Sequence, residues 1–174
     1  MERETCPVCG GNLVAVAGPV DSPILLVGAY PGWEELREGR PWVGNAGDVF
    51  RQELGKAGIN YRDCRVTNLW RHQEITPKHE YYEEEWEWHT NNVEAEMSER
   101  KAVLLMGRQP VLHFCKAAVT DVENMTVKSP MFPPNIEVAV AMRNPAQVLT
   151  EDGAVVGNVR HAIRRFAELT KDFR

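Results

Sequence analysis

Four short apolar segments, each closed by a turn-forming sequence, constrain the fold of this chain most strongly. These segments are rich in aliphatic and β-branched side chains and lie at residues 24–27, 65–68, 102–106 and 138–142. Segments with helical periodicity lie between or after them, at residues 48–57, 83–99, 109–118 and 158–172. Strands that alternate with helices predict a mostly parallel, four-stranded sheet covered on both faces, which is a three-layer α/β/α fold.

The same pattern predicts where a ligand binds. In sheets of this kind ligands bind at the carboxyl ends of the strands, and Gly28, Asn68, Gly107 and Asn144 are placed there. We also expect Asp48 to cap the helix that begins at this residue, because a carboxylate accepts hydrogen bonds from the free amides of a first turn.

The size and charge of the chain limit the classes of protein to which it can belong. Its 174 residues, 43% of them hydrophobic, predict one domain over residues 1–174 with a full core. The apolar runs are too short to span a membrane and the first residues are charged, so we expect a cytoplasmic protein. We also expect a monomer. The net charge of −5 argues against a broad phosphate-neutralising surface, so any contact with DNA must be local.

The cysteines and histidines indicate a metal site. Cys6 and Cys9 form a Cys-Pro-Val-Cys-Gly knuckle in which two thiolates can face one ion, and His72 and His89 can complete a tetrahedral set. His79 is an alternative ligand. The other two cysteines, at positions 64 and 115, lie in apolar stretches and are expected to be ordinary buried thiols rather than parts of a disulfide framework.

Two glycine-containing loops and one asparagine suggest recognition of a planar base. The first loop, Gly-Ala-Tyr-Pro-Gly, spans residues 28–32, and the second, Gly-Arg-Pro-Trp-Val-Gly, spans residues 39–44. Trp42 places an aromatic ring between flexible glycines, where it can stack on a base. Asn68 offers a donor and an acceptor that can match a carbonyl and an imide N–H, although an asparagine after a strand also forms turns.

Together these loops resemble the uracil-DNA glycosylase superfamily, and most of all its family 4, whose members carry an iron–sulfur cluster. The resemblance extends from Cys6 to about Leu149 and is most specific in the second loop. It implies a four-stranded parallel sheet, DNA as the partner, either single- or double-stranded, and cleavage of the bond between deoxyribose and a flipped-out uracil.

The resemblance also implies roles for individual residues. Trp42 takes the place of the aromatic residue that stacks on the base, and Asn68 that of the amide that reads its edge. Ala29 and Tyr30 belong to the same base-binding set, with the base lying between Trp42 and Tyr30. The residues expected to contact DNA are the helix-opening Arg108, Arg143 beside the last motif, and Gln147 near the position where the family inserts a wedge.

Both standard catalytic groups of the family are absent. Ala29 stands where the family has an acidic residue, and Asn144 stands where it has a histidine. Glycosidic cleavage passes through an oxocarbenium-like sugar while negative charge develops on the departing base. We therefore expect Glu35 to supply the carboxylate near the sugar and Asn144 to donate a hydrogen bond to the base. The alternative is that Glu34, Glu35 and Glu38 are exposed loop acids.

The metal set departs from the family too. Family 4 binds its cluster through four cysteines, whereas this chain offers Cys6, Cys9, His72 and His89 at the corresponding places. Two thiolates and two imidazoles are a common structural zinc set, so we expect one structural Zn²⁺ ion. A 4Fe-4S cluster, or no metal at all, remains the alternative.

The resulting hypothesis is a DNA glycosylase-like enzyme, associated with the nucleoid, that binds a flipped-out uracil or modified base and hydrolyses its N-glycosidic bond. We expect slow action on uracil in duplex DNA, or a preference for a base that leaves more readily. One alternative is a catalytically silent member of the superfamily that binds damaged or modified DNA, or a protein partner. Another is a nucleotide-binding domain unrelated to DNA, which the absence of a phosphate-cradling Gly-Lys-Ser/Thr loop disfavours.

Overall fold

The computed structural model describes residues 2–149 and 153–174 and contains one sheet of four parallel strands in the order β2-β1-β3-β4. The strands are β1 (Ile24–Gly28), β2 (Arg65–Asn68), β3 (Ala102–Met106) and β4 (Val138–Met142). The α-helices are α1 (Trp33–Glu38), α2 (Asn45–Lys56), α3 (Tyr82–Ser98), α4 (Arg108–Cys115), α5 (Val119–Val122) and α6 (Gly153–Leu169). The predicted three-layer α/β/α fold is confirmed.

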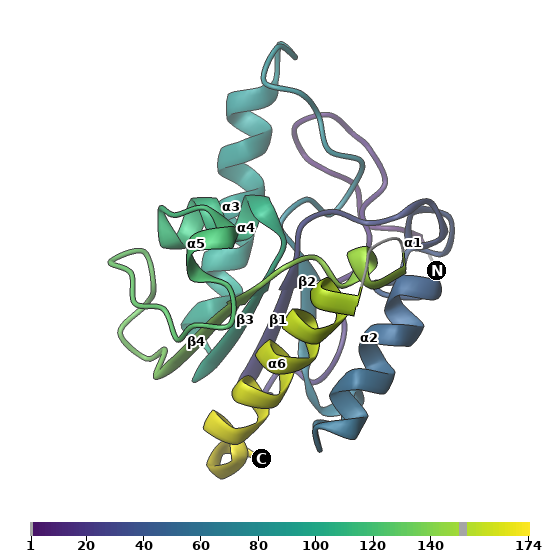
Figure 1. Cartoon of the computed structure of the whole chain (residues 1–174). Coiled ribbons are helices and arrows are strands. Elements are labelled where there is room, and N and C mark those ends of the chain that lie inside the picture. The colour runs from purple at the N-terminus through teal and green to yellow at the C-terminus, as the bar shows by residue number, and fades with distance from the viewer. Residues whose placement is uncertain (1, 150–152) are drawn as a thin grey trace.

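Alternate residues of the buried strands point to the two faces of the sheet, as β geometry requires. On β1, Leu26 packs in the cluster that contains Phe50 of α2 and Phe166 of α6. Its neighbour Leu25 packs in the second cluster, which contains Val93 of α3 and further residues of α3 and α4. Figure 1 shows the same division, with α2 and α6 on one side of the sheet and α3, α4 and α5 on the other.

Two helix ends differ from the sequence prediction. Helix α2 begins at Asn45 after Gly44, and no side chain caps it, so the predicted cap at Asp48 is wrong; Asp48 lies in the first turn and pairs with Arg51. Helix α4 ends at Cys115 because Lys116 adopts a left-handed conformation, with φ of 55°. Helices α1 and α5 were missed because segments of six and four residues are too short to establish a helical period.

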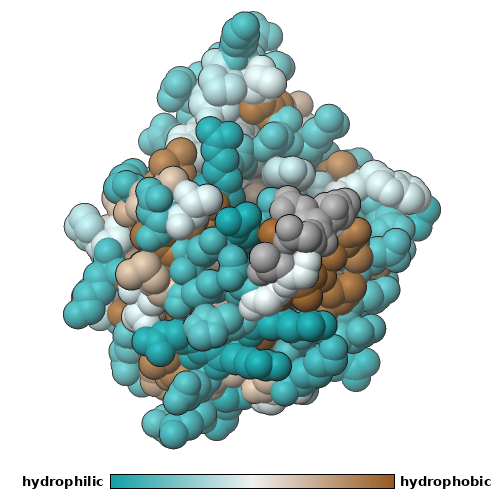
Figure 2. Space-filling model, in the orientation of Figure 1, coloured by the Kyte–Doolittle hydropathy of each residue, from teal (hydrophilic) through white to brown (hydrophobic). Residues whose placement is uncertain are grey.

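The face in Figure 2 is mostly hydrophilic, with hydrophobic side chains gathered over the N-terminal ends of α2 and α6. Among the described residues, no helix combines the length and the apolar character needed to cross a membrane.

Candidate functional site

A small pocket of about 140 Å³ opens where the ends of β1 and β2 meet the segment after β4. Its volume is well below the roughly 300–1,000 Å³ of pockets that hold drug-sized ligands, so it has room for one small planar group. It brings together all six residues that the sequence assigned to base binding or catalysis. The lining residues are Ala29, Tyr30, Pro31, Gly32, Glu35, Trp42, Ala46, Asn68, Asn144 and Ala146.

Gly28 allows two of these side chains to converge. A Cβ atom at Gly28 would lie 2.2 Å from Oδ1 of Asn68 and 2.9 Å from Cζ2 of Trp42. These distances are shorter than van der Waals contact, so only glycine lets the carboxamide and the indole approach the same point of the backbone. The strand end therefore places the two predicted base-contacting groups side by side.

Trp42 is held in an unusual backbone conformation. Its φ of 57° lies in the left-handed region, which is rare for a bulky residue and is found mostly where the surrounding structure enforces it. Arg51 donates a hydrogen bond to the Trp42 carbonyl, and a Cβ at Gly47 would lie 2.0 Å from that oxygen. The indole ring lies against Phe50, 4.9 Å between ring centroids. Helix α2 thus fixes the orientation of the ring at the pocket wall.

The polar groups of the pocket retain hydrogen-bonding capacity. The Asn68 residue is only 4% exposed, yet its carboxamide makes no hydrogen bond to another residue in the described part of the chain. The buried indole N–H of Trp42 likewise finds no acceptor among the described residues. Asn144 Oδ1 accepts a hydrogen bond from the Ala146 amide at 2.9 Å, which leaves its NH₂ group available as a donor. Such a set can bind a ligand that carries both carbonyl and N–H groups.

Glu35, on helix α1 directly after the first loop, is hydrogen-bonded to the second loop. Its Oε1 accepts a hydrogen bond from the Gly44 amide at 2.9 Å, and the residue is 9% exposed, so it is not one of the exposed loop acids. Glu38, by contrast, is exposed and pairs with Arg37 and Arg40, which lower the pKa of its carboxyl group. Glu35 therefore reaches the pocket wall with one carboxylate oxygen already engaged.

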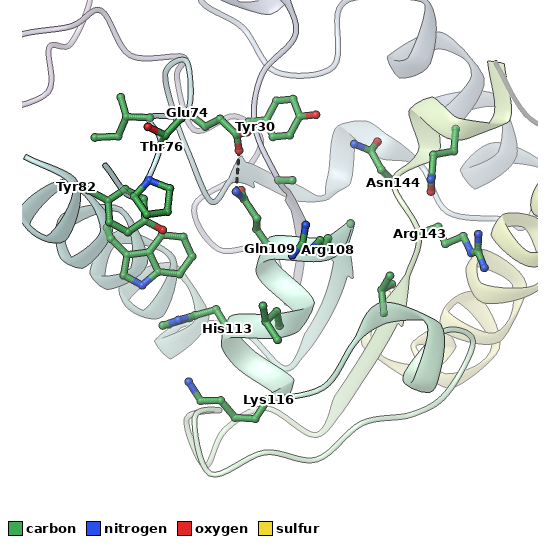
Figure 3. A pocket seen from close by; sticks show the side chains of 18 residues that line it. Tyr30, Glu74, Thr76, Tyr82, Arg108, Gln109, His113, Lys116, Arg143 and Asn144 are labelled. Atoms are coloured by element: carbon green, nitrogen blue, oxygen red, sulfur yellow. Dashed lines mark hydrogen bonds between the residues drawn. The ribbon is translucent and has the colours of Figure 1, made fainter. Parts of the chain in front are cut away.

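Tyr30 and the predicted DNA-contacting residues line a second, wider hollow. This wide cleft, of about 1010 Å³, shares Ala29, Tyr30 and Asn144 with the small pocket. Figure 3 shows Arg108 and Gln109 on α4 in the middle of the cleft, with Tyr82 on one side and Arg143 and Asn144 on the other. Arg108, Arg143 and Gln147 all line the cleft.

Arg143 is not a free cation. Its guanidinium donates to both carboxylate oxygens of Glu123, at 2.6 and 3.1 Å. A bidentate pair of this kind fixes the orientation of the side chain and offsets its charge. The sequence did not predict this pairing, because Glu123 lies 20 residues earlier in the chain.

A second polar cluster, the metal corner, is formed by Cys6, Cys9, His72 and Glu85. One potential ligand atom from each residue lies within 4.8 Å of the others. Sγ of Cys6 lies 3.3 Å from Oε2 of Glu85, Nε2 of His72 lies 3.0 Å from the same oxygen, and Sγ of Cys9 lies 3.6 Å from Nε2 of His72. Three of the four predicted ligands are thus brought together, and Glu85 is a fourth candidate that the sequence did not indicate.

The predicted ligand His89 lies directly behind this cluster. Its Nε2 is 3.1 Å from Nε2 of His72 and 3.3 Å from Oε2 of Glu85. The Arg71 amide donates to Nδ1 of His89 at 3.4 Å, so the hydrogen-bond network assigns the proton of a neutral ring to Nε2. Burial lowers the pKa of His89 to about 3, so the ring is neutral. In this tautomer His89 donates a hydrogen bond toward the cluster.

His72 has the opposite tautomer. Its Nδ1 lies 2.7 Å from the Gln73 carbonyl, which can only accept, so Nδ1 carries the proton and the lone pair of Nε2 faces the thiols. The alternative ligand His79 is exposed and contacts Tyr81 instead. His72 therefore has the form that a metal-binding imidazole requires.

Glu85 shows the clearest need for a cation. The residue is completely buried, and its Oε1 has no hydrogen-bond partner among the described residues. Although burial alone would raise its pKa, the hydrogen-bonding thiols of Cys9 and Cys6 and the neighbouring His72 outweigh this effect and lower it. A buried carboxylate with an unused oxygen is costly unless a positive charge lies nearby. One sequence signal could have identified it, because Glu85 and His89 are spaced i, i+4 on one helix face.

The remaining two cysteines are free, as expected. Cys64 is buried and Cys115 partly buried, and burial raises the pKa of these thiols to about 12 and about 11. Neither belongs to the cluster of candidate ligands.

Comparison with known proteins assigns this arrangement to a family. The sequence model of the uracil DNA glycosylase superfamily matches residues 15–171, which is most of the chain. The chain belongs to this superfamily. The matched range contains both loops, Asn68 and Asn144, together with the four strands that carry them.

Shorter matches connect the chain to proteins named Type-4 uracil-DNA glycosylase. The relative from Thermotoga maritima is 40% identical over 58 residues, and those from Pyrobaculum aerophilum and Archaeoglobus fulgidus are each 34% identical over 58 residues. Each match covers 33% of this chain and about 30% of the relative. The chain therefore aligns with under a third of the length of these relatives.

Proposed function

We propose that this protein binds a flipped-out uracil or modified base of DNA in the small pocket and hydrolyses its N-glycosidic bond. One observation carries the proposal: a pocket of about 140 Å³ has the carboxamide of Asn68 in its wall without a hydrogen-bond partner among the described residues. The carboxamide can therefore hydrogen-bond a ligand without first breaking a bond to another described residue. A pyrimidine edge, with a carbonyl beside an N–H, is a matching partner.

The other lining residues have roles that follow from their positions. Trp42 would cover the face of the base, with Tyr30 at the mouth of the pocket on the other side. Water would replace the base at the sugar carbon, which gives an abasic site and the free base. Glu35 would stabilise the positive sugar, and the NH₂ group of Asn144 would stabilise the negative charge of the departing base.

The chemistry of these groups predicts a slow enzyme or a selective one. A neutral amide stabilises a leaving anion less than a charged imidazolium does, and one oxygen of Glu35 is already bound to Gly44. A base that leaves more readily than uracil needs less assistance. Slow action on uracil, with faster release of an altered base, is therefore the expected pattern.

A second candidate function is binding without cleavage. The observation that favours it is the apolar Ala29 in the pocket wall, together with the neutral Asn144. A protein with this pocket would retain affinity for damaged or modified DNA, or for a protein partner, and would release no base.

An assay of abasic-site formation separates the two functions. Wild type and Asn68→Ala would be incubated with oligonucleotides that each carry one altered base, uracil among them. Base release by wild type that falls at least tenfold in Asn68→Ala supports the enzyme. Base-dependent binding with no abasic sites, even after long incubation, supports the second candidate. No base release and no base-dependent binding would exclude both.

We further propose that the metal corner holds one structural Zn²⁺ ion, with Cys6, Cys9, His72 and Glu85 as ligands. Zinc binds thiolate, imidazole and carboxylate at about 2.0–2.3 Å, which places the ligand atoms of a tetrahedron roughly 3.3–3.8 Å apart. Two of the separations in the metal corner, 3.3 and 3.6 Å, lie in this range, the third is 3.0 Å, and all four atoms lie within 4.8 Å of one another, so small shifts would let them share one ion. Iron–sulfur clusters are held chiefly by thiolates, and this corner has two. The ion would tie the N-terminal segment to α3 without contacting the base.

Elemental analysis of the purified protein tests the metal proposal. One equivalent of zinc per chain and no visible absorption are expected. Iron with inorganic sulfide, and a brown colour, would contradict it and restore the cluster that the family resemblance implies.

A further inference from the structure

The wide cleft is larger than the recognition of one base requires. Its volume of about 1010 Å³ is roughly seven times that of the small pocket, and the two hollows are adjacent, with Ala29, Tyr30 and Asn144 lining both. A base held in the small pocket would therefore have its neighbouring nucleotides at the entrance of the cleft. Figure 3 shows that the cleft extends along α4, from Gln109 past His113 to Lys116.

The charges that line the cleft oppose the charge of the whole chain. The protein has a net charge of −5, yet the cleft is lined by Arg108 and Lys116, and by Arg143, whose charge Glu123 offsets, against one acidic lining residue, Glu74. Glu74 accepts a hydrogen bond from Gln109 at 2.7 Å. Within residues 2–149 and 153–174, no ion pair joins Arg108 or Lys116 to a carboxylate. These two cations lie eight residues apart on or beside α4, roughly 12 Å along its axis, so they can contact different phosphates of one strand.

One wall of the cleft is aromatic. Tyr82 and Trp86 lie on α3 with their rings nearly parallel, 16° between planes and 6.0 Å between centroids. Both residues are partly exposed and line the cleft. Aromatic rings beside a positive groove are the means by which proteins hold single-stranded nucleic acid, because bases stack on the rings while cations follow the backbone.

We infer that the preferred substrate is a single strand, whose nucleotides next to the flipped base lie in the wide cleft and stack on Tyr82. This inference rests on the proposed function, because it extends the ligand of the small pocket along the strand. In a duplex the neighbouring bases are paired and stacked on one another, so their faces cannot reach a protein ring. The aromatic wall therefore distinguishes an unpaired strand from a duplex, whereas the cations alone do not.

Fluorescence anisotropy with labelled oligonucleotides tests the inference. The first probe is a single strand with one central uracil, and the second is the same strand annealed to its complement. Further single strands of the same sequence carry another altered base at the centre, or thymine as the unaltered control. Wild type is expected to bind the single strand about tenfold or more tightly than the duplex. Tyr82→Leu should reduce affinity for the single strand by fivefold or more, the lower end of the range for base stacking, and Tyr81→Leu is the matched control outside the cleft.

A charge variant keeps the test decisive if Tyr82→Leu fails to fold. Lys116→Gln should reduce the salt dependence of single-strand binding by about 0.7 in the log–log slope, the value for one phosphate contact. Lys171→Gln, in the C-terminal turn outside the cleft, should leave the slope unchanged.

The outcomes separate this inference from the proposed function. Equal affinity for single strand and duplex, with no effect of Tyr82→Leu or Lys116→Gln, would overturn the inference. If the protein still distinguished the altered base from thymine, the proposed function would stand. If the protein bound single strands much more tightly than duplexes, but with equal affinity for every central base, the result would support strand binding in the wide cleft. It would count against base recognition in the small pocket.

Discussion

The small pocket and the metal corner are both polar sites. One stretch of chain contributes a residue to each, because Asn68 ends β2 and His72 follows four residues later. In the metal corner the four candidate ligand atoms lie within 4.8 Å of one another, and three of their contacts are 3.0, 3.3 and 3.6 Å long. In the small pocket the polar atoms surround a space of about 140 Å³.

The difference shows that some polar groups of the interior contribute to stability and others contribute to ligand binding. Groups that satisfy one another through a bound ion hold segments of the chain together. Groups that lack a protein partner contribute less to stability and are available to bind a ligand. Changes in the metal corner should therefore alter stability first, and changes in the small pocket should alter recognition first.

Cys6→Ser should show the largest effect. It removes a buried ligand, and the melting temperature should fall by roughly 10 °C or more, since a chain of this size loses about 2–4 °C per kcal/mol. Cys115→Ser, outside the cluster, is the control. The measurement is thermal unfolding with and without a chelator. If both variants lowered the melting temperature equally, or if the chelator left the melting temperature of wild type unchanged, the metal corner would have no special role in stability.

The pair Glu85→Gln and His89→Gln sharpens the description of the metal corner. Glu85→Gln removes a ligand and should lower metal affinity by more than a hundredfold. His89→Gln removes a donor that orients the ligands, and such changes typically cost 10–100-fold. Competition with a chromophoric chelator measures both. If His89→Gln lost more metal affinity than Glu85→Gln, the His89 imidazole would be the fourth ligand and Glu85 would be the residue that orients it.

Asn144→His tests the small pocket with a substitution that is expected to increase the excision rate. An imidazolium should stabilise the departing base better than an amide does, so uracil excision should rise by about tenfold or more. Single-turnover assays of abasic-site formation give the rate. Loss of activity, with the fold intact by circular dichroism, would show that Asn144 is placed differently from the family's histidine.

Glu35→Gln should have the smallest effect of these changes on stability, because the amide oxygen can still accept the Gly44 hydrogen bond. Its excision rate should nevertheless fall severalfold if the carboxylate charge stabilises the sugar cation. Glu35→Ala, which also breaks the link between the loops, should in addition lower the melting temperature. Equal rates for Glu35→Gln and wild type would assign Glu35 a purely structural role.

The sequence predicted the strands better than the site. Strands β1, β3 and β4 follow from their apolar runs, since a fully buried parallel strand is apolar along its length, whereas the edge strand β2 is indicated only by its β-branched Val66 and Thr67. The convergence of Trp42 and Asn68 could be anticipated because both follow strand ends at one edge. Glu85 could not, because a carboxylate in an acidic helix start looks solvated until the fold buries it. The pairing of Arg143 with Glu123 depends on the path of a long loop, which no local pattern specifies.

The central claim is that the small pocket recognises one extrahelical base through Asn68. The most direct test compares the affinities of wild type and Asn68→Ala for strands that differ only in one central base, uracil or another altered base against thymine. The account predicts that wild type distinguishes at least one altered base from thymine by tenfold or more, and that Asn68→Ala binds both strands equally. Undiminished discrimination in Asn68→Ala, or none in wild type with any base, would contradict it.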